Sequence, residues 1–423
     1  MSEGIREVLV KEKDEAVKIL SSKTVKREIS LGKSLENNLV KVIIGPRRAG
    51  KSYFSLQSIN DKRFAYVNFD DEKLLKTSDY EEYIKNLKEV YGKFELLLLD
   101  EVQNLSRWEL FVNRLQREGY NLIVTGSNSN LLSTELATHL TGRHLQISVF
   151  TFSLSEFMKA KNYLFDTNKT QLKSVQGEIL NLTSEYIKKG GYPEITVNES
   201  IDRNNYITTL VDSIIIKDIV RRHRIRYSNA IYNIIRYLIS AFASEFSYNS
   251  VAKASGLASV HTAEKYVAYI QEAFLVFALD RFSFKAKEQI KSPKKLYVID
   301  NGIIDAFALE PMLEQRRLME NSVAIELMRR SNDFTKFKVF YWKDSTAEVD
   351  FVIKEGIKIK QLIQVTYSVE NEKTKKREVK AILKASDNLR CNDLVILTWD
   401  YEKTEEYDGK KIKFIPLYKW LLL

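Results

Sequence analysis

The chain has 423 residues, enough for roughly two to four domains, and 44% of them are apolar and 29% charged, as in globular proteins. No apolar stretch approaches the roughly 18 uninterrupted residues that cross a bilayer, and the charged N-terminus lacks a signal-peptide core, so we expect no membrane partner and a cytoplasmic location. The single cysteine excludes an internal disulfide framework, and four histidines in no ligand-like spacing argue against a zinc site. The net charge of +10 points weakly toward nucleic acid, and a solvated charged surface explains it equally well.

The first informative segment is a strand followed by a glycine-rich turn. Residues 39–46 (LVKVIIGP) are apolar and rich in β-branched side chains, which predicts a buried strand. The turn GPRRAGKS matches the phosphate-binding loop G-x-x-x-x-G-K-[ST], in which glycines let N–H groups converge on phosphates, the lysine reaches the terminal phosphates and the serine ligates magnesium. The predicted binding residues for ATP and Mg²⁺ are Gly45, Pro46, Arg47, Arg48, Ala49, Gly50, Lys51 and Ser52.

A second apolar run, FELLLLDEVQNL at residues 94–105, predicts a strand that ends in two acidic residues, the Walker B pattern. At the carboxyl end of a strand beside the phosphate loop, Asp100 would hold magnesium. Glu101 would polarise the attacking water, which a hydrolase needs and a nucleotide-binding protein without turnover does not. Together the two motifs predict a magnesium-dependent ATPase.

A third strand, within YNLIVTGSNSNLL, ends near Ser127 and Asn128. We expect this strand to lie between the two motifs, where either side chain could contact the γ-phosphate or the water, and the sequence does not choose between them. Arg143, just before the next strand-like run, is placed to act as an arginine finger on a neighbouring subunit's nucleotide. The alternative for Arg143 is a structural ion pair.

The order of the motifs GPRRAGKS, LLLLDEVQ, TGSNSNLL, TGRH, FSLSEF and GGYPE resembles the archaeal and bacterial branch of AAA+ ATPases. That branch is related to the signal-transduction NTPases and carries a C-terminal domain of restriction-endonuclease-like fold, and the resemblance covers essentially the whole chain. It implies an α/β multidomain protein with a P-loop AAA+ core built on a parallel sheet. The domains implied are the ATPase core at 1–153, a helical lid at 154–226, a winged helix at 227–300 and an α/β restriction-endonuclease-like domain at 301–423.

The resemblance also implies roles for residues outside the core. The turn KKGGYPE would place Tyr192 and Pro193 beside the adenine, whereas on its own terms it is a helix–helix turn. Residues 227–300 read as three helices and two strands joined by a basic loop, the order of a winged helix. Its third helix would contact base edges, and its hairpin would contact phosphates. The alternative is that this surface packs against the ATPase domain. The predicted DNA contacts are His261, Thr262, Lys265, Lys285, Lys287, Lys291, Lys294 and Lys295.

In the resembled C-terminal fold, a helix acid, an aspartate and a Glu-x-Lys motif bind magnesium and activate water. Here the acid is Glu320 and the aspartate is Asp350, but the third motif reads QVT from Gln364. Glutamine is a weak neutral metal ligand and threonine cannot replace the lysine, although a basic residue from elsewhere could. We therefore expect a degenerate metal site in a domain that binds DNA and cleaves it poorly or not at all.

Two functional classes fit these features best. The first is an ATPase motor or switch that acts on branched, broken or single-stranded DNA as a homo-oligomer, for example a hexamer; the basic hairpin favours it. The second is a signalling-type NTPase whose winged helix and C-terminal domain bind protein. An ATP-regulated nuclease is a further alternative, and a metabolic kinase is disfavoured because no small-substrate domain is evident.

Overall fold

The computed structural model describes residues 2–22, 24–76, 80–128, 142–164, 173–225, 228–307, 314–331 and 337–423. The chain forms two compact units, Met1–Phe150 with Glu272–Phe274, and Thr151–Gln271 with Leu275–Leu423. The three domains expected after residue 153 therefore share one unit. The predicted stretch between Asn128 and Gly142 lies outside the described residues.

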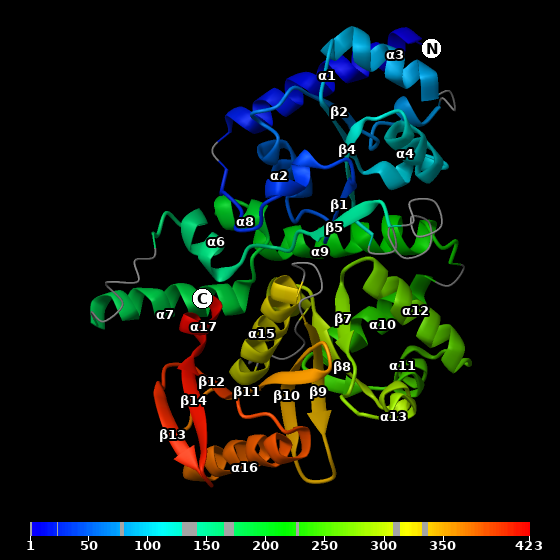
Figure 1. Ribbon diagram of the computed structural model, residues 1–423. Coiled ribbons are helices and arrows are strands. Elements are labelled where there is room, and N and C mark those ends of the chain that lie inside the picture. The colour runs from blue at the N-terminus through cyan, green and yellow to red at the C-terminus, as the bar shows by residue number, and fades with distance from the viewer. Residues whose placement is uncertain are drawn as a thin grey trace. The chain divides into compact units, whose positions relative to one another are not determined.

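The first unit is a parallel sheet covered by helices (Figure 1). Its five strands lie in the order β2-β3-β4-β1-β5, and every neighbouring pair is parallel. The strands are β1 (Val40–Ile44), β2 (Phe64–Asn68), β3 (Leu96–Asp100), β4 (Asn121–Gly126) and β5 (His144–Ser148). The expectation that the third predicted strand lies between the two nucleotide motifs is confirmed, because β4 pairs with both β1 and β3.

Helices cover both faces of this sheet. Alternate side chains of β1 and β3 enter two separate apolar cores, one with residues of α1, α3 and α4 and the other with residues of α2. A strand buried on both faces reads as a continuous apolar run, which explains the sequences LVKVII and LLLLD. The helices are α1 (Ser2–Ser21), α2 (Lys51–Ser58), α3 (Tyr80–Tyr91) and α4 (Trp108–Arg117).

The second unit begins with helices, as the sequence predicts. Ser153 caps the first of them in a reciprocal pair of hydrogen bonds with Glu156. The turn after α7 requires glycine, because a Cβ at Gly191 would lie 2.5 Å from the Phe152 carbonyl oxygen. The helices are α6 (Leu154–Ala160), α7 (Lys173–Lys189), α8 (Pro193–Val197), α9 (Arg203–Ser213) and a π-helix (Ile214–Arg221).

The next segment, residues 228–298, contains the three predicted helices and two predicted strands. A short strand that was not predicted joins them in an antiparallel sheet of order β6-β8-β7. The basic stretch between the two predicted strands is not a simple loop, because it contains the short helix α13. The elements are α10 (Ser228–Ser240), β6 (Ser244–Phe246), α11 (Tyr248–Ser255), α12 (Val260–Glu272), β7 (Val276–Leu279), α13 (Ala286–Lys291) and β8 (Lys294–Val298).

The C-terminal part of the second unit is a mixed sheet of six strands in the order β13-β14-β12-β11-β10-β9. The strands β9, β10 and β11 are antiparallel, whereas β12 is parallel to β11. These strands and their flanking helices match the predicted order, and the hairpin β13–β14 and α17 were not predicted. The elements are α14 (Asn301–Phe307), α15 (Gln315–Ser331), β9 (Lys338–Lys343), β10 (Glu348–Glu355), β11 (Lys358–Val365), α16 (Glu372–Leu389), β12 (Leu394–Thr398), β13 (Lys403–Tyr407), β14 (Lys410–Pro416) and α17 (Leu417–Leu421).

A search of the described helices finds none with the length and apolar character needed to cross a membrane.

One acidic side chain is buried where α1 packs on β2. Glu12 accepts a hydrogen bond from the Asn68 N–H at 3.2 Å, and only 5% of the residue is exposed. Burial raises the pKa of Glu12 from 4.5 to about 8, against the effect of the backbone hydrogen bond and with a further contribution from Asp71. The folded state therefore holds a proton on Glu12 that the unfolded chain releases.

We predict that the Glu12→Gln variant melts at a higher temperature than the wild type at pH 8 and at nearly the same temperature at pH 5. The folded-state pKa of Glu12 lies above the unfolded value, so the wild type's free energy of unfolding falls as the pH rises through this window, by at most about 1.4 kcal/mol per pH unit. Glu15→Gln is the matched control, because the Glu15 side chain on the same helix is 51% exposed. An equal shift for Glu12→Gln at both pH values would contradict this account.

Candidate functional site

The phosphate-loop sequence lies between β1 and α2, at the carboxyl edge of the parallel sheet. Gly50 has φ 88° and Arg48 has φ 64°, so the backbone reverses into the first turn of α2. A Cβ at Gly45 would lie 2.0 Å from the Val149 carbonyl oxygen, which restricts this position to glycine. The first N–H groups of a helix such as α2 have no partner within the helix, and N–H groups of this kind bind anions.

A residue that the sequence did not single out braces this loop. Arg27 donates hydrogen bonds to the Ala49 carbonyl oxygen at 2.8 Å and to the Phe150 carbonyl oxygen at 2.6 Å. It thereby ties the loop to the segment that follows β5. No local motif marks Arg27, because it lies more than twenty residues before the loop that it holds.

Lys51 fills the hollow of the loop. Its Nζ donates to the Gly45 and Pro46 carbonyl oxygens at 3.2 and 3.1 Å, and it lies 3.8 Å from Glu101 Oε1. Lys51 is buried, so its charge acts in a region that bulk water screens poorly. The ammonium is therefore positioned at the place where terminal phosphates would lie in a phosphate loop.

Asp100 is the last residue of β3 and is buried among hydroxyl groups. It accepts hydrogen bonds from the Tyr66 hydroxyl at 3.0 Å, from the Thr125 hydroxyl and from the Ser52 hydroxyl. Burial and the charge of Glu101 raise the pKa of Asp100 above its ordinary value, while these hydroxyl groups act to lower it. A hydroxyl and a carboxylate next to a phosphate site are the donor set that Mg²⁺ takes, so Ser52 and Asp100 fit that ion.

Glu101 follows in a left-handed conformation, with φ 48°, which turns its side chain toward the loop. Its N–H donates to Thr125 Oγ1 at 3.1 Å, and its carboxylate accepts from Gln103 and, at 3.3 Å, from the Ser127 hydroxyl. Burial acts to raise the pKa of Glu101, but Lys51 and Gln103 hold it below its ordinary value. Glu101 is thus an ionised, oriented carboxylate, the state that a general base requires.

Both candidates at the end of β4 are buried, and the contacts of Ser127 place it beside Glu101. Ser127 is almost fully buried and contacts both Glu101 and, at 3.4 Å, Gln103. Asn128 is buried as well. The Gln103 amide was not predicted from the sequence, because a glutamine just after a strand carries no signal by itself.

Arg143 lies at the opposite edge of the sheet from the phosphate loop. Its carbonyl oxygen accepts from the Val40 N–H at 3.0 Å, at the start of β1, whereas the loop begins after Ile44, at the other end of that strand. Five residues of strand separate the two ends by roughly 15 Å. The exposed Arg143 side chain therefore cannot serve the nucleotide of its own chain.

Tyr192 and Pro193 belong to the second unit. Tyr192 is buried there, Pro193 is the first residue of α8, and the preceding Gly191 N–H donates to Asp300 at 2.8 Å. Their contact with adenine stays a prediction.

The predicted DNA contacts fall into two groups. Most lie on the surface of residues 228–298, with the His261 side chain 87% exposed and that of Lys285 78% exposed. Lys294 is half-buried and pairs with Asp280. The prediction for Lys295 does not fit its position, because only 2% of the residue is exposed and no phosphate can reach it. The exposed or half-buried members of the set are His261, Thr262, Lys265, Lys285, Lys287, Lys291 and Lys294.

Lys295 lies instead in a buried cluster of carboxylates. Its Nζ is 2.7 Å from Glu320 Oε1 on α15, and 2.8 and 2.9 Å from Glu348 Oε1 and Asp350 Oδ1 on β10. The structure thus brings together Glu320 and Asp350, as the sequence predicts. It also places Lys295 and Glu348 in the same cluster, which the sequence does not predict. The lysine comes from β8, more than fifty residues before Asp350.

The Gln364 amide is held by hydrogen bonds at both ends. Its Oε1 accepts from the Asp350 N–H at 3.1 Å and its Nε2 donates to Glu378 at 2.7 Å. With Lys295 in place, no group of three or more His, Cys, Asp or Glu side chains among the described residues could hold a metal ion. The predicted metal role of Gln364 is therefore not supported by its geometry, because the amide is used to fix β10 and α16.

Comparison with known proteins agrees with the reading of the first unit. Residues 37–158 match an AAA domain, and residues 180–313 and 316–420 match two domains of unknown function, DUF8612 and DUF4143. The uncharacterized protein MJ1544 of Methanocaldococcus jannaschii is 36% identical over 418 residues, which cover 95% of this chain and 92% of that protein. An uncharacterized protein of Haemophilus influenzae is 28% identical over 405 residues, 92% of this chain and 95% of that one.

Among solved structures, the Walker-type ATPase PABY2304 of Pyrococcus abyssi is similar at 14% identity and a TM-score of 0.44, over 69% of this chain and 100% of that chain. This similarity is too low to say anything about the activity of the present chain.

Proposed function

The chain belongs to the same family as the uncharacterized protein MJ1544 and contains an AAA domain, and from this premise we propose that it is a magnesium-dependent ATPase that works as a switch on DNA. The observation that carries the proposal is the meeting of Lys51, Asp100 and Glu101 at one edge of the sheet. A nucleotide-binding protein without turnover needs the first two of these groups. An ionised glutamate hydrogen-bonded beside them favours hydrolysis.

Each residue has a role that follows from its contacts. The loop N–H groups bind the phosphates, Lys51 reaches the terminal ones, and Ser52 and Asp100 would hold Mg²⁺. When bound, the metal would supply positive charge that offsets the negative charge developing on the phosphates. Glu101 orients the attacking water and accepts its proton, and Ser127 keeps the carboxylate in place.

We predict that Glu101→Gln binds ATP as tightly as the wild type but loses at least about 100-fold in kcat, because the general base is gone while the phosphate contacts stay. Lys51→Ala should instead lose nucleotide binding. Binding is measured with a fluorescent ATP analogue and turnover by phosphate release. Glu95→Gln is the control, since that side chain is 52% exposed and pairs with Arg63. A Glu101→Gln variant with wild-type turnover would refute the assignment.

We also propose that the ATPase acts as a homo-oligomer in which Arg143 reaches a neighbour's nucleotide. The support is geometric. Arg143 is exposed at the sheet edge opposite its own phosphate loop, so only a second copy could bring a nucleotide to it. The backbone of this residue is fixed by two hydrogen bonds, from Val40 and from Gln116. The backbone is thus anchored while the exposed guanidinium lies away from its own phosphate loop, and a guanidinium from a second chain stabilises transition-state charge in P-loop NTPases.

We predict that Arg143→Ala loses on the order of 10³-fold in kcat and retains ATP binding. Mixing it with Lys51→Ala, which is inactive for a different reason, should restore activity, because an intact loop then meets an intact arginine at some interfaces. Arg63→Ala is the control, as its side chain is 68% exposed and pairs with Glu95. Full activity of a monomer in light scattering would rule out the proposal.

DNA is the partner that the second unit supports best. We propose that residues 228–298 form a winged helix, because helix, strand, two helices and two further strands follow one another as in that fold. We propose also that α15, β9, β10, β11, α16 and β12 form a restriction-endonuclease-like core that does not cleave. Lys287 and Lys291 on α13 are exposed, and neither has an ion pair within the part of the chain that the structure describes.

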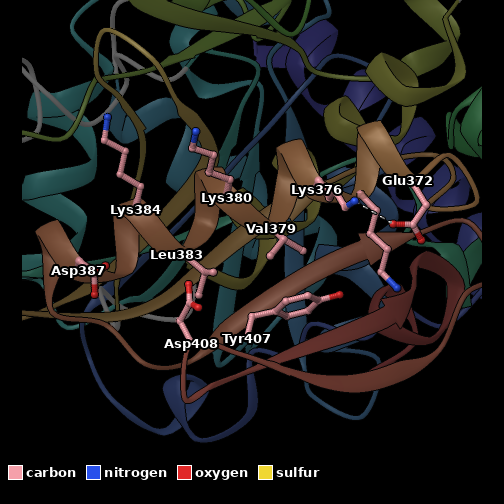
Figure 2. A pocket seen from close by; sticks show the side chains of 10 residues that line it. Glu372, Lys376, Val379, Lys380, Leu383, Lys384, Asp387, Tyr407 and Asp408 are labelled. Carbon is pink, nitrogen blue, oxygen red and sulfur yellow. Dashed lines mark ion pairs between the residues drawn. The ribbon is translucent and has the colours of Figure 1, made fainter.

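A second basic surface lies on α16. A groove of about 570 Å³ runs between this helix and the β13–β14 turn, with Val379, Leu383 and Tyr407 among its apolar lining (Figure 2). Lys376 and Lys380 lie one turn apart on α16 and are exposed. The carboxylate near Lys376 is Glu372 at 3.9 Å, and Lys380 pairs with no described residue. Ammonium groups that are not tied to carboxylates are available for phosphates.

We predict that the pairs Lys287→Ala/Lys291→Ala and Lys376→Ala/Lys380→Ala each weaken duplex binding and reduce the slope of log affinity against log salt. Each phosphate contact that is lost lowers this slope by about 0.9, because fewer counterions are released. Fluorescence anisotropy of a labelled duplex measures both quantities. The control pair is Lys360→Ala/Lys413→Ala, whose ammonium groups are bound to Glu355 and Asp393. A shallow slope that neither pair changes would favour a protein partner instead.

A further inference from the structure

The strongest feature outside the ATPase site is the cluster around Lys295. One ammonium lies within 2.7–2.9 Å of three carboxylates, on Glu320, Glu348 and Asp350. An ammonium has three N–H donors, so all of them are used. Glu320 and Asp350 have side chains only 3% and 1% exposed, and that of Lys295 is 3% exposed.

From this geometry we propose that the three carboxylates form a cation site whose built-in cation is the Lys295 ammonium, and that this ammonium excludes a divalent metal ion from the same position. A divalent ion needs oxygen ligands at about 2.0–2.6 Å. The Nζ is in hydrogen-bond contact with the same oxygens, so both cations cannot be present. The inference stands on contacts within the second unit and does not depend on ATP hydrolysis.

The surrounding charges keep Lys295 protonated. Burial acts to lower its pKa, but Asp350 and Glu320 raise it well above the ordinary value. Burial likewise acts to raise the pKa of Asp350, and Lys295 and Arg316 hold it below the ordinary range. Arg316 lies 3.8 Å from Asp350 and donates a hydrogen bond to the Val365 carbonyl oxygen at 3.1 Å. The two cations thus offset charge that would otherwise be buried without compensation.

The site is also closed by the strand that supplies the lysine. Two residues further along β8, the Tyr297 hydroxyl donates to Glu320 at 2.9 Å. The Val298 N–H donates to Asn321 Oδ1 and the Val298 carbonyl oxygen accepts from Asn321 Nδ2, both at 2.9 Å. The strand β8 is therefore fixed along α15, and while it stays there a phosphodiester cannot approach Glu320 and Asp350, whereas the Glu348 side chain is 33% exposed.

The test is metal binding by the full-length Lys295→Met variant, which removes the ammonium and keeps much of the side-chain length. Without metal, Glu320 and Asp350 lose their shared ammonium, while Glu348 keeps its ion pair with Lys343 at 3.2 Å. Glu320 and Asp350 then repel one another, and we expect the melting temperature to fall by on the order of 10 °C. Adding Mn²⁺ or Ca²⁺ alone, without nucleotide, should restore most of the loss.

Lys294→Met is the matched control, because Lys294 is adjacent to Lys295 but pairs with Asp280, and its side chain is 30% exposed. This variant should show no metal-dependent rescue.

Two further measurements keep the proposal falsifiable. In isothermal titration with Mn²⁺, the wild type and Asp350→Asn should behave alike, because the wild type binds no Mn²⁺ at Asp350. The Lys295→Met variant should bind Mn²⁺, and the double variant Lys295→Met/Asp350→Asn should not. Binding by the wild type that depends on Asp350 would overturn the proposal. So would a Lys295→Met variant that no divalent ion stabilises. If neither Lys295→Met nor Lys295→Gln folds even with Mn²⁺ present, the idea of an exchangeable cation is also wrong.

Discussion

The parallel pairing of β3 and β1 on either side of β4 is the constraint on which the nucleotide site depends. Parallel strands end at the same edge of the sheet. The phosphate loop, Asp100 and the end of β4 therefore lie close together although they are far apart in the sequence. The Thr125 hydroxyl then donates a hydrogen bond to the Asp100 carboxylate and accepts one from the Glu101 N–H. These two bonds fix the positions of the neighbouring acidic residues relative to β4. The same topology sends Arg143 to the far edge, because β5 begins where β1 begins.

Burial gives similar side chains different roles in this molecule. Glu101 is buried beside Lys51 and several donors, and its pKa falls, whereas burial beside fewer donors raises the pKa of Glu12 to about 8. The pKa of Glu320 lies between those of Glu101 and Glu12. Burial and the charge of Asp350 raise its pKa to about 7 in spite of Lys295. The number and type of partners, and not burial alone, therefore decide which acids are ionised near neutral pH.

The sequence was sufficient wherever function rests on a contiguous motif. The loop from Gly45 to Ser52, the acidic end of β3 and most of the order of elements in the second unit could be predicted, because hydrophobic period and glycine placement are local signals. The short elements β6, α13 and α17 and the β13–β14 hairpin were missed. Contacts between distant segments could not be predicted. Nothing near Arg27 shows that it braces the loop, and nothing near Lys295 shows that its partners lie on β10 and α15. A lysine in a basic stretch was therefore assigned to the surface, although it is buried.

The contacts of Lys295 and Gln364 explain how Glu320 and Asp350 can be buried together. Two carboxylates would be unstable in the interior without a cation. Here the cation arrives on β8, and the amide of Gln364 bonds the Asp350 backbone and Glu378. Buried ion pairs add little to stability compared with apolar packing, but a buried charge that has lost its partner is costly. Displacing β8 would remove Lys295 from the carboxylates, so the cluster disfavours any such arrangement. Lys295 and Gln364 thus belong to one buried arrangement, which connects β8 and α16 to the acidic residues of β10.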